Sequence, residues 1–310
     1  MAFTIRPALR ENTPLIVGLA GPTKSGKTYS AHRLAQGLTD GRPIAMLNAE
    51  GARGHQYADK FKYMACDIDA PFSYDRYQEA MTEIKKINPG VIIIDSASHA
   101  HDGPGGMLEQ HDSELDRMAG NDYKKRDRMT WTAWILPKKN ENAFIYAMLG
   151  MDCPIILCFR AKEKIKIVPG KQPIDLGWQP IASDRIAFET IFTLTLPPHS
   201  KGVPDLSISE MREPFDTMVP EGRAIDEALG RQLREWSAGG VIVPQTLGAE
   251  AIAAHLKAIN DASTNETLKT AFTVAYKAAN AARDVDALAD FEAAKDARKA
   301  ALTPKQGAQI

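Results

Sequence analysis

The sequence predicts an α/β fold with a mostly parallel central sheet, followed by a small α-helical appendage. Between residues 15 and 196, short runs rich in Ile, Val and Leu alternate with longer mixed segments, which is typical of buried parallel strands joined by helices. From residue 248 to 302, alanine dominates, proline is absent and apolar residues recur three and four positions apart, which favours helices. The length of 310 residues suits one large domain and a smaller one.

The apolar runs predict strands at 15–19, 44–47, 91–94, 155–159 and 191–196. Helical spacing predicts helices at 28–37 and 74–87, between the strands. Residues 197–222 are rich in proline and polar turn formers, and we expect them to hold one more strand, at 204–209, and to close the sheet at its edge. We expect the last helix of this part at 225–236.

These patterns divide the chain into a domain at 1–240, a linker at 241–247, an alanine-rich helical appendage at 248–302 and a frayed tail at 303–310. The linker assignment rests on the glycine pair at 239–240 and on Pro244. In the appendage, Ser263 and Glu266 have the spacing of a capping box at the start of the second helix, and we expect Asp284 to cap the third.

Charge, cysteine content and hydropathy exclude several classes of protein. The 38 basic and 39 acidic side chains give a net charge of −1, so contact with nucleic acid requires a local basic patch. Three cysteines suit neither a disulfide framework nor paired zinc ligands, which predicts a cytoplasmic location. No apolar run approaches the roughly 20 residues that span a bilayer, and the N-terminus lacks the layout of a signal peptide, so we expect no membrane contact.

Residues 21–28, Gly-Pro-Thr-Lys-Ser-Gly-Lys-Thr, match the pattern G-x-x-x-x-G-K-[ST] between a predicted strand and a predicted helix. The two glycines allow successive N–H groups to face a polyphosphate at the positive end of the helix. Lys27 would then reach the β- and γ-phosphates of ATP, and Thr28 would supply a hydroxyl ligand to Mg²⁺. The alternative is a glycine turn with an incidental lysine. The predicted nucleotide-binding residues are Gly21, Pro22, Thr23, Lys24, Ser25, Gly26, Lys27, Thr28 and Tyr29.

Two carboxylates are expected beside this motif. Asp95 follows the apolar run 91–94, as a Mg²⁺ ligand at the carboxyl end of a buried strand would. Ser96 comes next, so the base that activates water must lie elsewhere, and Glu50, just past the second predicted strand, is our candidate. Both assignments have alternatives: an aspartate after an apolar run is common, and Glu50 could be a solvated loop residue or a partner for Arg53.

The order of these features resembles that of RecA-like recombinases: a phosphate-binding loop, a glutamate after the next strand, and a strand that ends in Asp-Ser. More closely, the segments 5–12, 21–28, 95–99, 103–106 and 158–164 resemble the phage-encoded AAA-type, RecA-like ATPases, which include single-strand annealing proteins. The resemblance covers about residues 3–240 and implies a RecA-like P-loop NTPase core.

The resemblance also implies roles for individual residues. Glu50 matches the glutamate that activates water in such recombinases. The positions that match the ATP and Mg²⁺ ligands are Lys27, Thr28 and Asp95. Related ATPases place γ-phosphate sensors, or charges offered across a subunit interface, after the strand that here precedes Arg160, Lys162 and Lys164. Such cations neutralise charge that develops in the transition state. A solvated basic loop is the alternative, and Arg185 is a further candidate of the same kind.

Residues 121–171 hold eleven basic and five acidic side chains, a local balance of +6 in a chain whose total is −1. Tyr123, Trp131 and Trp134 lie among them, which suits a surface that follows phosphates and stacks unpaired bases. In RecA-like folds, loops of this region face the DNA. The alternative is that the tryptophans pack on the sheet and the basic residues form a solvated face. The predicted nucleic-acid contacts are Lys124, Lys125, Arg126, Arg128, Lys138, Lys139 and Lys164.

His99 and His101 have the spacing of a metal-ligand pair, but further ligands are not evident in the sequence. The glycines that follow favour a mobile loop that faces DNA or responds to nucleotide.

We therefore expect an enzyme that binds ATP and Mg²⁺, hydrolyses ATP and acts on single-stranded DNA in phage-type recombination, repair or replication. Its predicted catalytic residues are Glu50, Lys27, Arg160 and Lys162. The expected partners are single-stranded DNA, further copies of the chain, and a phage recombination nuclease or single-strand binding protein, in the cytoplasm of a bacterial host. Two alternatives stay open: a small-molecule kinase, and a nucleotide-gated assembly or packaging module without DNA-stimulated turnover.

Overall fold

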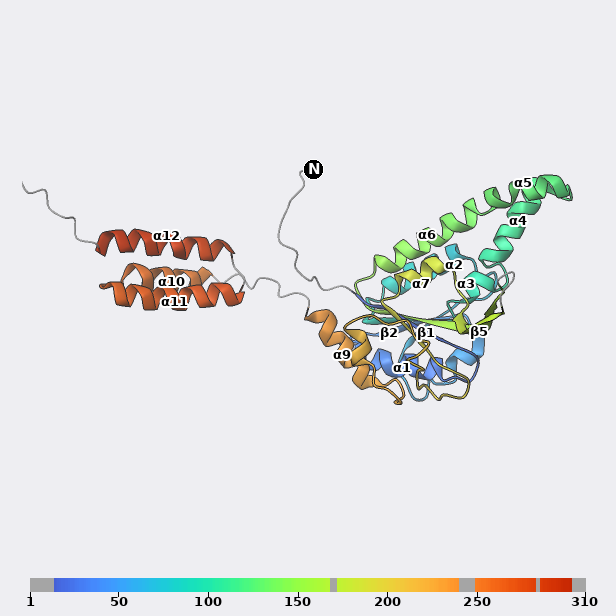
Figure 1. The fold of residues 1–310 in the computed structure, drawn as a ribbon, viewed down its shortest axis with the longest axis horizontal. Coiled ribbons are helices and arrows are strands. Elements are labelled where there is room, and N and C mark those ends of the chain that lie inside the picture. The colour runs from blue at the N-terminus through green and yellow to red at the C-terminus, as the bar shows by residue number, and fades with distance from the viewer. Residues whose placement is uncertain (1–13, 168–171, 240–248, 283–284, 303–310) are drawn as a thin grey trace, which may run out of the picture. The chain divides into compact units, whose positions relative to one another are not determined.

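A computed structural model describes residues 14–167, 172–239, 249–282 and 285–302 (Figure 1). The chain divides into two compact units, one within residues 14–238 and the other containing the three C-terminal helices. The predicted linker at 241–247, the tail at 303–310 and the segment 5–12 lie outside the described residues.

The first unit is built on a seven-stranded sheet. Its strands are β1 (Ile16–Gly21), β2 (Ile44–Asn48), β3 (Met64–Asp67), β4 (Val91–Asp95), β5 (Ile155–Lys166), β6 (Ile174–Pro180) and β7 (Phe192–Thr195). The order is β3-β2-β4-β5-β1-β7, and every pairing along this path is parallel, while β6 pairs with β5 in the antiparallel sense. The predicted α/β fold with a mostly parallel sheet is confirmed.

Helices cover both faces of this sheet (Figure 1). Strands β1, β2 and β4 consist of buried residues only, because a parallel sheet is covered on both sides. One face packs against α1 (Lys27–Leu38) and α9 (Glu227–Ala238), and the other against α2 (Tyr74–Lys85), α6 (Ile135–Leu149) and α7 (Asp184–Glu189). Each face therefore has its own apolar core.

Between β4 and α6 the chain forms α3 (His99–Asp102), α4 (Met107–Ala119) and α5 (Tyr123–Ala133), and α4 and α5 extend away from the sheet (Figure 1). A 3₁₀ turn, η1 (Gly51–His55), follows β2, and a short helix, α8 (Phe215–Met218), precedes α9. Among the residues that the structure describes, no helix is long and apolar enough to cross a bilayer.

The structure differs from the expected strands at four places, of which three concern strands that are present. Strands β3 and β6 were not predicted: β3 lies at the sheet edge and is largely exposed, and β6 carries polar residues and a glycine. Strand β5 continues to Lys166 instead of ending at Phe159.

The strand predicted at 204–209 is wrong. Only the isolated bridge between Thr193 and Glu210 pairs there. The Thr195 N–H instead donates to Ser209 Oγ at 2.9 Å, and the Asp205 N–H donates to Thr195 O at 2.9 Å. Side-chain and turn hydrogen bonds satisfy the free edge of β7, so a further ladder is not needed.

The second unit consists of α10 (Ala249–Asn260), α11 (Asn265–Ala282) and α12 (Val285–Leu302) around a small apolar core that includes Leu268 and Phe291. This confirms the expected helical C-terminal region. The capping box lies one residue later than predicted: the Thr267 N–H donates to Thr264 Oγ1 at 3.1 Å, and the Thr264 N–H donates to Thr267 Oγ1 at 3.0 Å. Asp284, the predicted cap of the third helix, lies outside the described residues.

Candidate functional site

Strand register brings the candidate residues to one edge of the sheet. Gly21 lies beside Arg160, and Asp95 lies between Asn48 and Cys158 on its two neighbouring strands. Because these strands are parallel, the segments that follow them leave the sheet at the same carboxyl edge. The loop after β1, the segment after β2, the end of β4 and the part of β5 that begins at Arg160 therefore converge.

The loop between β1 and α1 requires both of its glycines. Gly26 has φ of 99°, in the left-handed region, and a Cβ there would lie 2.6 Å from Gly202 N. A Cβ on Gly21 would collide with Leu196 O. No side chain caps the N-terminus of α1, so the free N–H groups of its first turn are available to an anion.

This loop contains two polar side chains, Lys27 and Ser25, whose hydrogen-bonding capacity is not fully used. The Lys27 ammonium donates to Gly21 O at 2.7 Å and to Pro22 O at 2.9 Å, and burial lowers the pKa of Lys27. The buried Ser25 Oγ makes no hydrogen bond within the described residues. A half-buried cation held by carbonyl oxygens, beside a buried hydroxyl without a partner and free N–H groups, fits a phosphate chain.

The remaining loop residues are more open. Thr23 and Lys24 are exposed, and Lys24 has φ of 67°. The ring of Tyr29, the last predicted nucleotide-binding residue, lies 5.3 Å from that of Tyr57 and 5.2 Å from that of Phe61.

Thr28 and Asp95 meet, although 67 positions separate them in the chain: Thr28 Oγ1 donates to Asp95 Oδ2 at 2.6 Å. Asp95 is buried, and burial raises the pKa of its carboxyl group. A buried carboxylate beside a hydroxyl is the donor set that Mg²⁺ takes next to a phosphate chain. The predicted metal pair therefore fits the ion by its chemistry.

Glu50 lies beside this pair, in the segment after β2. Its Oε1 accepts from the Arg160 guanidinium at 3.0 Å and its Oε2 accepts from Arg53 at 2.9 Å. His99 Nδ1 is 3.9 Å from Oε1, and burial lowers the pKa of His99. The structure thus brings Glu50 to the expected edge and also gives it the Arg53 contact that we had set out as an alternative.

Several residues at this edge were not found from the sequence. Ser98 Oγ accepts from the Arg160 N–H at 2.9 Å. Gly202 N and Ser200 Oγ both donate to Ser25 O, at 2.9 and 3.1 Å. The loop after β7 therefore supports the loop between β1 and α1, which we call the glycine-rich loop. No motif signals these contacts, because each joins segments that are far apart in the chain.

Arg160 is the predicted cation that enters the site. Lys162 lines an open groove of about 370 Å³ together with Pro22, Thr23, Arg160 and Trp178. Lys164 is exposed on the same strand. All three cations lie on β5, which pairs with β6 from Ala161 onwards, so the alternative of a solvated basic loop is wrong in its secondary structure. Arg185 instead lies 3.6 Å from the buried Glu141 carboxylate.

Residues 123–149 of the basic region form helices α5 and α6, so the expectation of loops here is wrong, while contact with DNA stays a prediction. Arg126 forms an ion pair with Asp116. The half-buried Trp134 stacks on His111 at a centroid distance of 4.1 Å, whereas Trp131 is 81 % exposed. Trp134 is therefore packed, as the alternative interpretation expects, whereas Trp131 is free to contact a partner. The other predicted contacts here are exposed: Lys124, Lys125, Arg128, Lys138 and Lys139.

The segment 99–102 is a helical turn with buried His99, not the mobile loop expected from its glycines. Gly103 N donates to His99 O at 2.9 Å. Across the described residues, no group of three or more His, Cys, Asp or Glu side chains is placed to hold a metal ion by itself.

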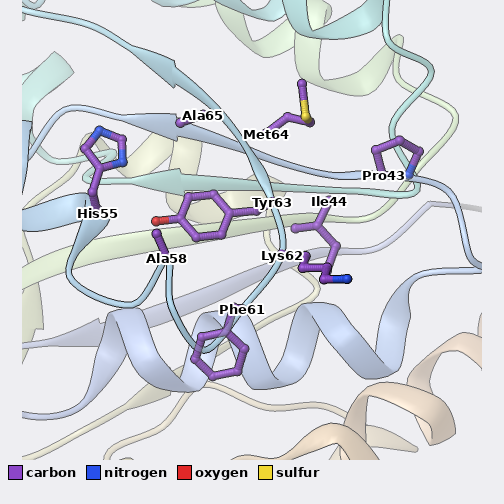
Figure 2. Close-up of a pocket in the computed structure, with 9 residues that line it drawn as sticks. All are labelled: Pro43, Ile44, His55, Ala58, Phe61, Lys62, Tyr63, Met64 and Ala65. Atoms are coloured by element: carbon purple, nitrogen blue, oxygen red, sulfur yellow. The ribbon is translucent and has the colours of Figure 1, made fainter.

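A separate groove of about 400 Å³ lies beside the edge strand β3 (Figure 2). It is lined by Pro43, Ile44, His55, Ala58, Phe61, Lys62, Tyr63, Met64 and Ala65. None of the predicted site residues lines it, so the candidate site is the one at the carboxyl edge of the sheet. Comparison of the chain with protein-family models and with curated proteins returned no match.

Proposed function

We propose that the protein is a P-loop ATPase with a RecA-like core, which binds ATP and Mg²⁺ at the carboxyl edge of its sheet. The contact between Thr28 and Asp95 carries the proposal. It supports the proposal because a hydroxyl directly after a phosphate-binding loop and a carboxylate at a strand end form a magnesium site only when they meet.

Each residue of the site has a task in this chemistry. Lys27 and the N–H groups of the loop bind the phosphates, while Thr28 and Asp95 would hold Mg²⁺, which would neutralise phosphate charge. Water attacks the γ-phosphorus as the bond to the β–γ bridging oxygen breaks, and Glu50 takes the proton of that water. Arg160 and Lys162 supply positive charge where negative charge develops on the transferred group.

We further propose that the ATPase acts on single-stranded DNA in phage-type recombination, repair or replication, as a nucleotide-gated oligomer in a bacterial cytoplasm. The exposed cations on α5 and α6 support the DNA contact, and the exposed Lys162 supports a charge offered to a neighbouring copy. A recombination nuclease or a single-strand binding protein would act beside it.

The test is steady-state ATP hydrolysis by the full chain without nucleic acid, with single-stranded DNA and with duplex, at low and moderate salt. We expect several-fold stimulation by single strands that weakens with salt. Lys27→Ala should abolish turnover, whereas Lys86→Ala, which removes an exposed lysine on the surface, should not change it. Turnover that persists in Lys27→Ala would overturn the ATPase assignment.

Two other outcomes would redirect the assignment. Turnover that a metabolite stimulates and DNA does not would identify a small-molecule kinase. Normal nucleotide affinity with no turnover under any condition would identify a nucleotide-gated assembly or packaging module, and Glu50→Gln would then change nothing.

A further inference from the structure

Helices α5 and α6 present one continuous outer face. The Trp134 N–H donates to Trp131 O at 3.3 Å and the Lys138 N–H donates to Trp134 O at 3.1 Å, so the helical path continues through their junction. Residues that recur at intervals of three and four share a helix face. Here they form an outer stripe, which consists of Lys124, Arg128, Trp131, Ile135, Lys138, Asn142 and Tyr146.

The apolar members of the outer stripe are not used in the core. Trp131 is 81 % exposed, Tyr146 73 % and Ile135 65 %. The opposite face of the same helices supplies the buried residues, which are Ala133, Pro137, Glu141, Phe144, Ile145 and Met148. Large side chains that gather in the open on one face of a folded helix mark a contact surface.

The charges around the outer stripe indicate what it contacts. Lys125 and Lys139 flank the stripe and are exposed, so five exposed cations surround its aromatic residues. Asp127 is the one exposed acidic side chain among residues 123–149, all of which the structure describes, because Glu141 is buried. Arg126 and Trp134 are excluded from this surface by their contacts with Asp116 and His111.

We propose that the outer stripe binds single-stranded nucleic acid, with a base stacked on Trp131 and phosphates paired with Lys124 and Arg128. The inference rests on the proposed function, because it assigns a surface to the single-stranded partner proposed there. A polyanion complements the cations, and an unpaired base offers the flat face that an exposed indole stacks on. A second copy of the chain fits less well, because two such stripes would face each other with like charges.

The outer stripe is long enough for several nucleotides. Lys124 and Tyr146 are 22 positions apart, which corresponds to about 33 Å along a helix. Helices α4 and α5 extend away from the sheet (Figure 1). A nucleic-acid strand can therefore approach the outer stripe without occupying the proposed ATP site.

The experiment measures binding of a labelled oligothymidylate to the full chain by fluorescence anisotropy over a range of salt concentrations. Trp131→Ala should weaken binding about tenfold at every salt concentration, the loss expected for one stacked base. Trp131→Phe should keep most of the affinity. Lys124→Gln combined with Arg128→Gln should reduce the slope of log affinity against log salt by about 1.4, the change for two lost phosphate contacts.

Two matched controls separate the outer stripe from exposure and charge in general. Phe188→Ala removes an aromatic side chain that is 78 % exposed on α7, and Lys269→Gln with Lys277→Gln removes two exposed lysines of α11. Both should leave oligothymidylate affinity unchanged. Both control variants should also keep the basal ATP hydrolysis of the wild-type chain, because neither changes the loop between β1 and α1, Asp95, Glu50 or the cations of β5.

Each result decides the inference. Wild-type affinity in Trp131→Ala and in the double variant overturns it, and if Trp131→Ala then also changes the sedimentation coefficient, the stripe is a contact between copies. If the wild-type chain hydrolyses ATP but does not bind oligothymidylate, the inference about the outer stripe and the DNA part of the proposed function are both overturned. The ATPase part then stands. Stripe-dependent binding without any hydrolysis upholds the stripe and overturns the proposed ATPase.

Discussion

At the scale of single residues, the Glu50 carboxylate is held from two sides. Arg160 donates to one oxygen at 3.0 Å and Arg53 to the other at 2.9 Å. Arg160 is itself positioned by the hydrogen bond from its N–H to Ser98 Oγ. The orientation of the Glu50 carboxylate, the proposed base, therefore depends on side chains from three separate segments: Arg53, Ser98 and Arg160.

We predict that Glu50→Gln lowers kcat for ATP hydrolysis by about 10²–10⁴, the usual contribution of a general base. Affinity for ATP should remain, because Lys27, Thr28 and Asp95 are unchanged. Steady-state kinetics and equilibrium binding of a fluorescent ATP analogue measure the two effects. Glu83→Gln, on the exposed surface of α2, is the control. Unchanged turnover in Glu50→Gln would reduce Glu50 to an ion-pair partner of Arg53.

His32 makes the stability of the first unit depend on pH. Its ring is buried in α1 and stacks on Phe61 at 5.0 Å, and its ring nitrogens make no hydrogen bond within the described residues. Burial lowers the pKa of His32 from 6.5 to about 4. The unfolded chain therefore takes up a proton near pH 6.5, whereas the folded chain does so only near pH 4.

The free energy of unfolding should fall as the pH drops from 6.5 towards 4, by on the order of 3 kcal/mol from this residue. His32→Phe should remove that part of the pH dependence, because phenylalanine carries no titrating group. Urea unfolding of both proteins at several pH values in this window provides the measurement. An identical loss of stability in the two proteins would show that other groups dominate.

At the scale of elements, α1 and α9 pack so closely at Gly37 and Gly230 that neither position has room for a side chain. A Cβ on Gly230 would lie 2.8 Å from Gly37 Cα and would collide with Leu34 O. Arg33 of α1 adds a two-point ion pair with Glu227 of α9. Because α1 directly follows the glycine-rich loop, this contact supports the helix that presents Lys27 and Thr28.

We predict that Gly230→Ala destabilises the first unit by about 1–3 kcal/mol through overpacking, although alanine favours helix formation by about 1 kcal/mol over glycine. Backbone atoms, which cannot rotate away, cause the collision. Gln232→Ala, on the exposed side of the same helix, should change stability little. Thermal unfolding followed by circular dichroism tests this, and a rise in Tm for Gly230→Ala would contradict the packing argument.

At the scale of the whole molecule, the two compact units have separate apolar cores. The clusters on the two faces of the sheet and the cluster within α10–α12 have no residue in common. Every residue of the proposed ATP site lies between Gly21 and Arg160 or on the strand that continues from it. The C-terminal helices are thus not needed to build the site.

We predict that a chain ending at Ala238 keeps the fold of the first unit and its affinity for ATP. The physical reason is that both sheet-covering cores remain complete. Binding of a fluorescent ATP analogue and the thermal unfolding curve of the shortened chain measure this, with the full chain as the reference. Loss of nucleotide binding in a shortened chain that still folds would make α10–α12 part of the site.

Local patterns made part of this protein predictable. Apolar runs located five of the strands, because a strand buried on both faces must be apolar along its length. The glycine-rich motif likewise identified the loop before α1. Its two glycines are needed there because a Cβ at either position would collide with neighbouring backbone atoms. The strands β3 and β6 were not predicted, and the strand predicted at 204–209 is wrong, because sheet edges are satisfied by side chains and turns as readily as by a ladder.

The sequence by itself determined the fold class and the candidate chemistry, because hydrophobic periodicity and turn chemistry are properties of neighbouring residues. Only the tertiary structure decided that Thr28 meets Asp95, that Arg160 holds Glu50, and that Trp131 is exposed while Trp134 is packed. Such contacts depend on strand order, register and helix packing, which place residues tens of positions apart within a hydrogen bond of one another.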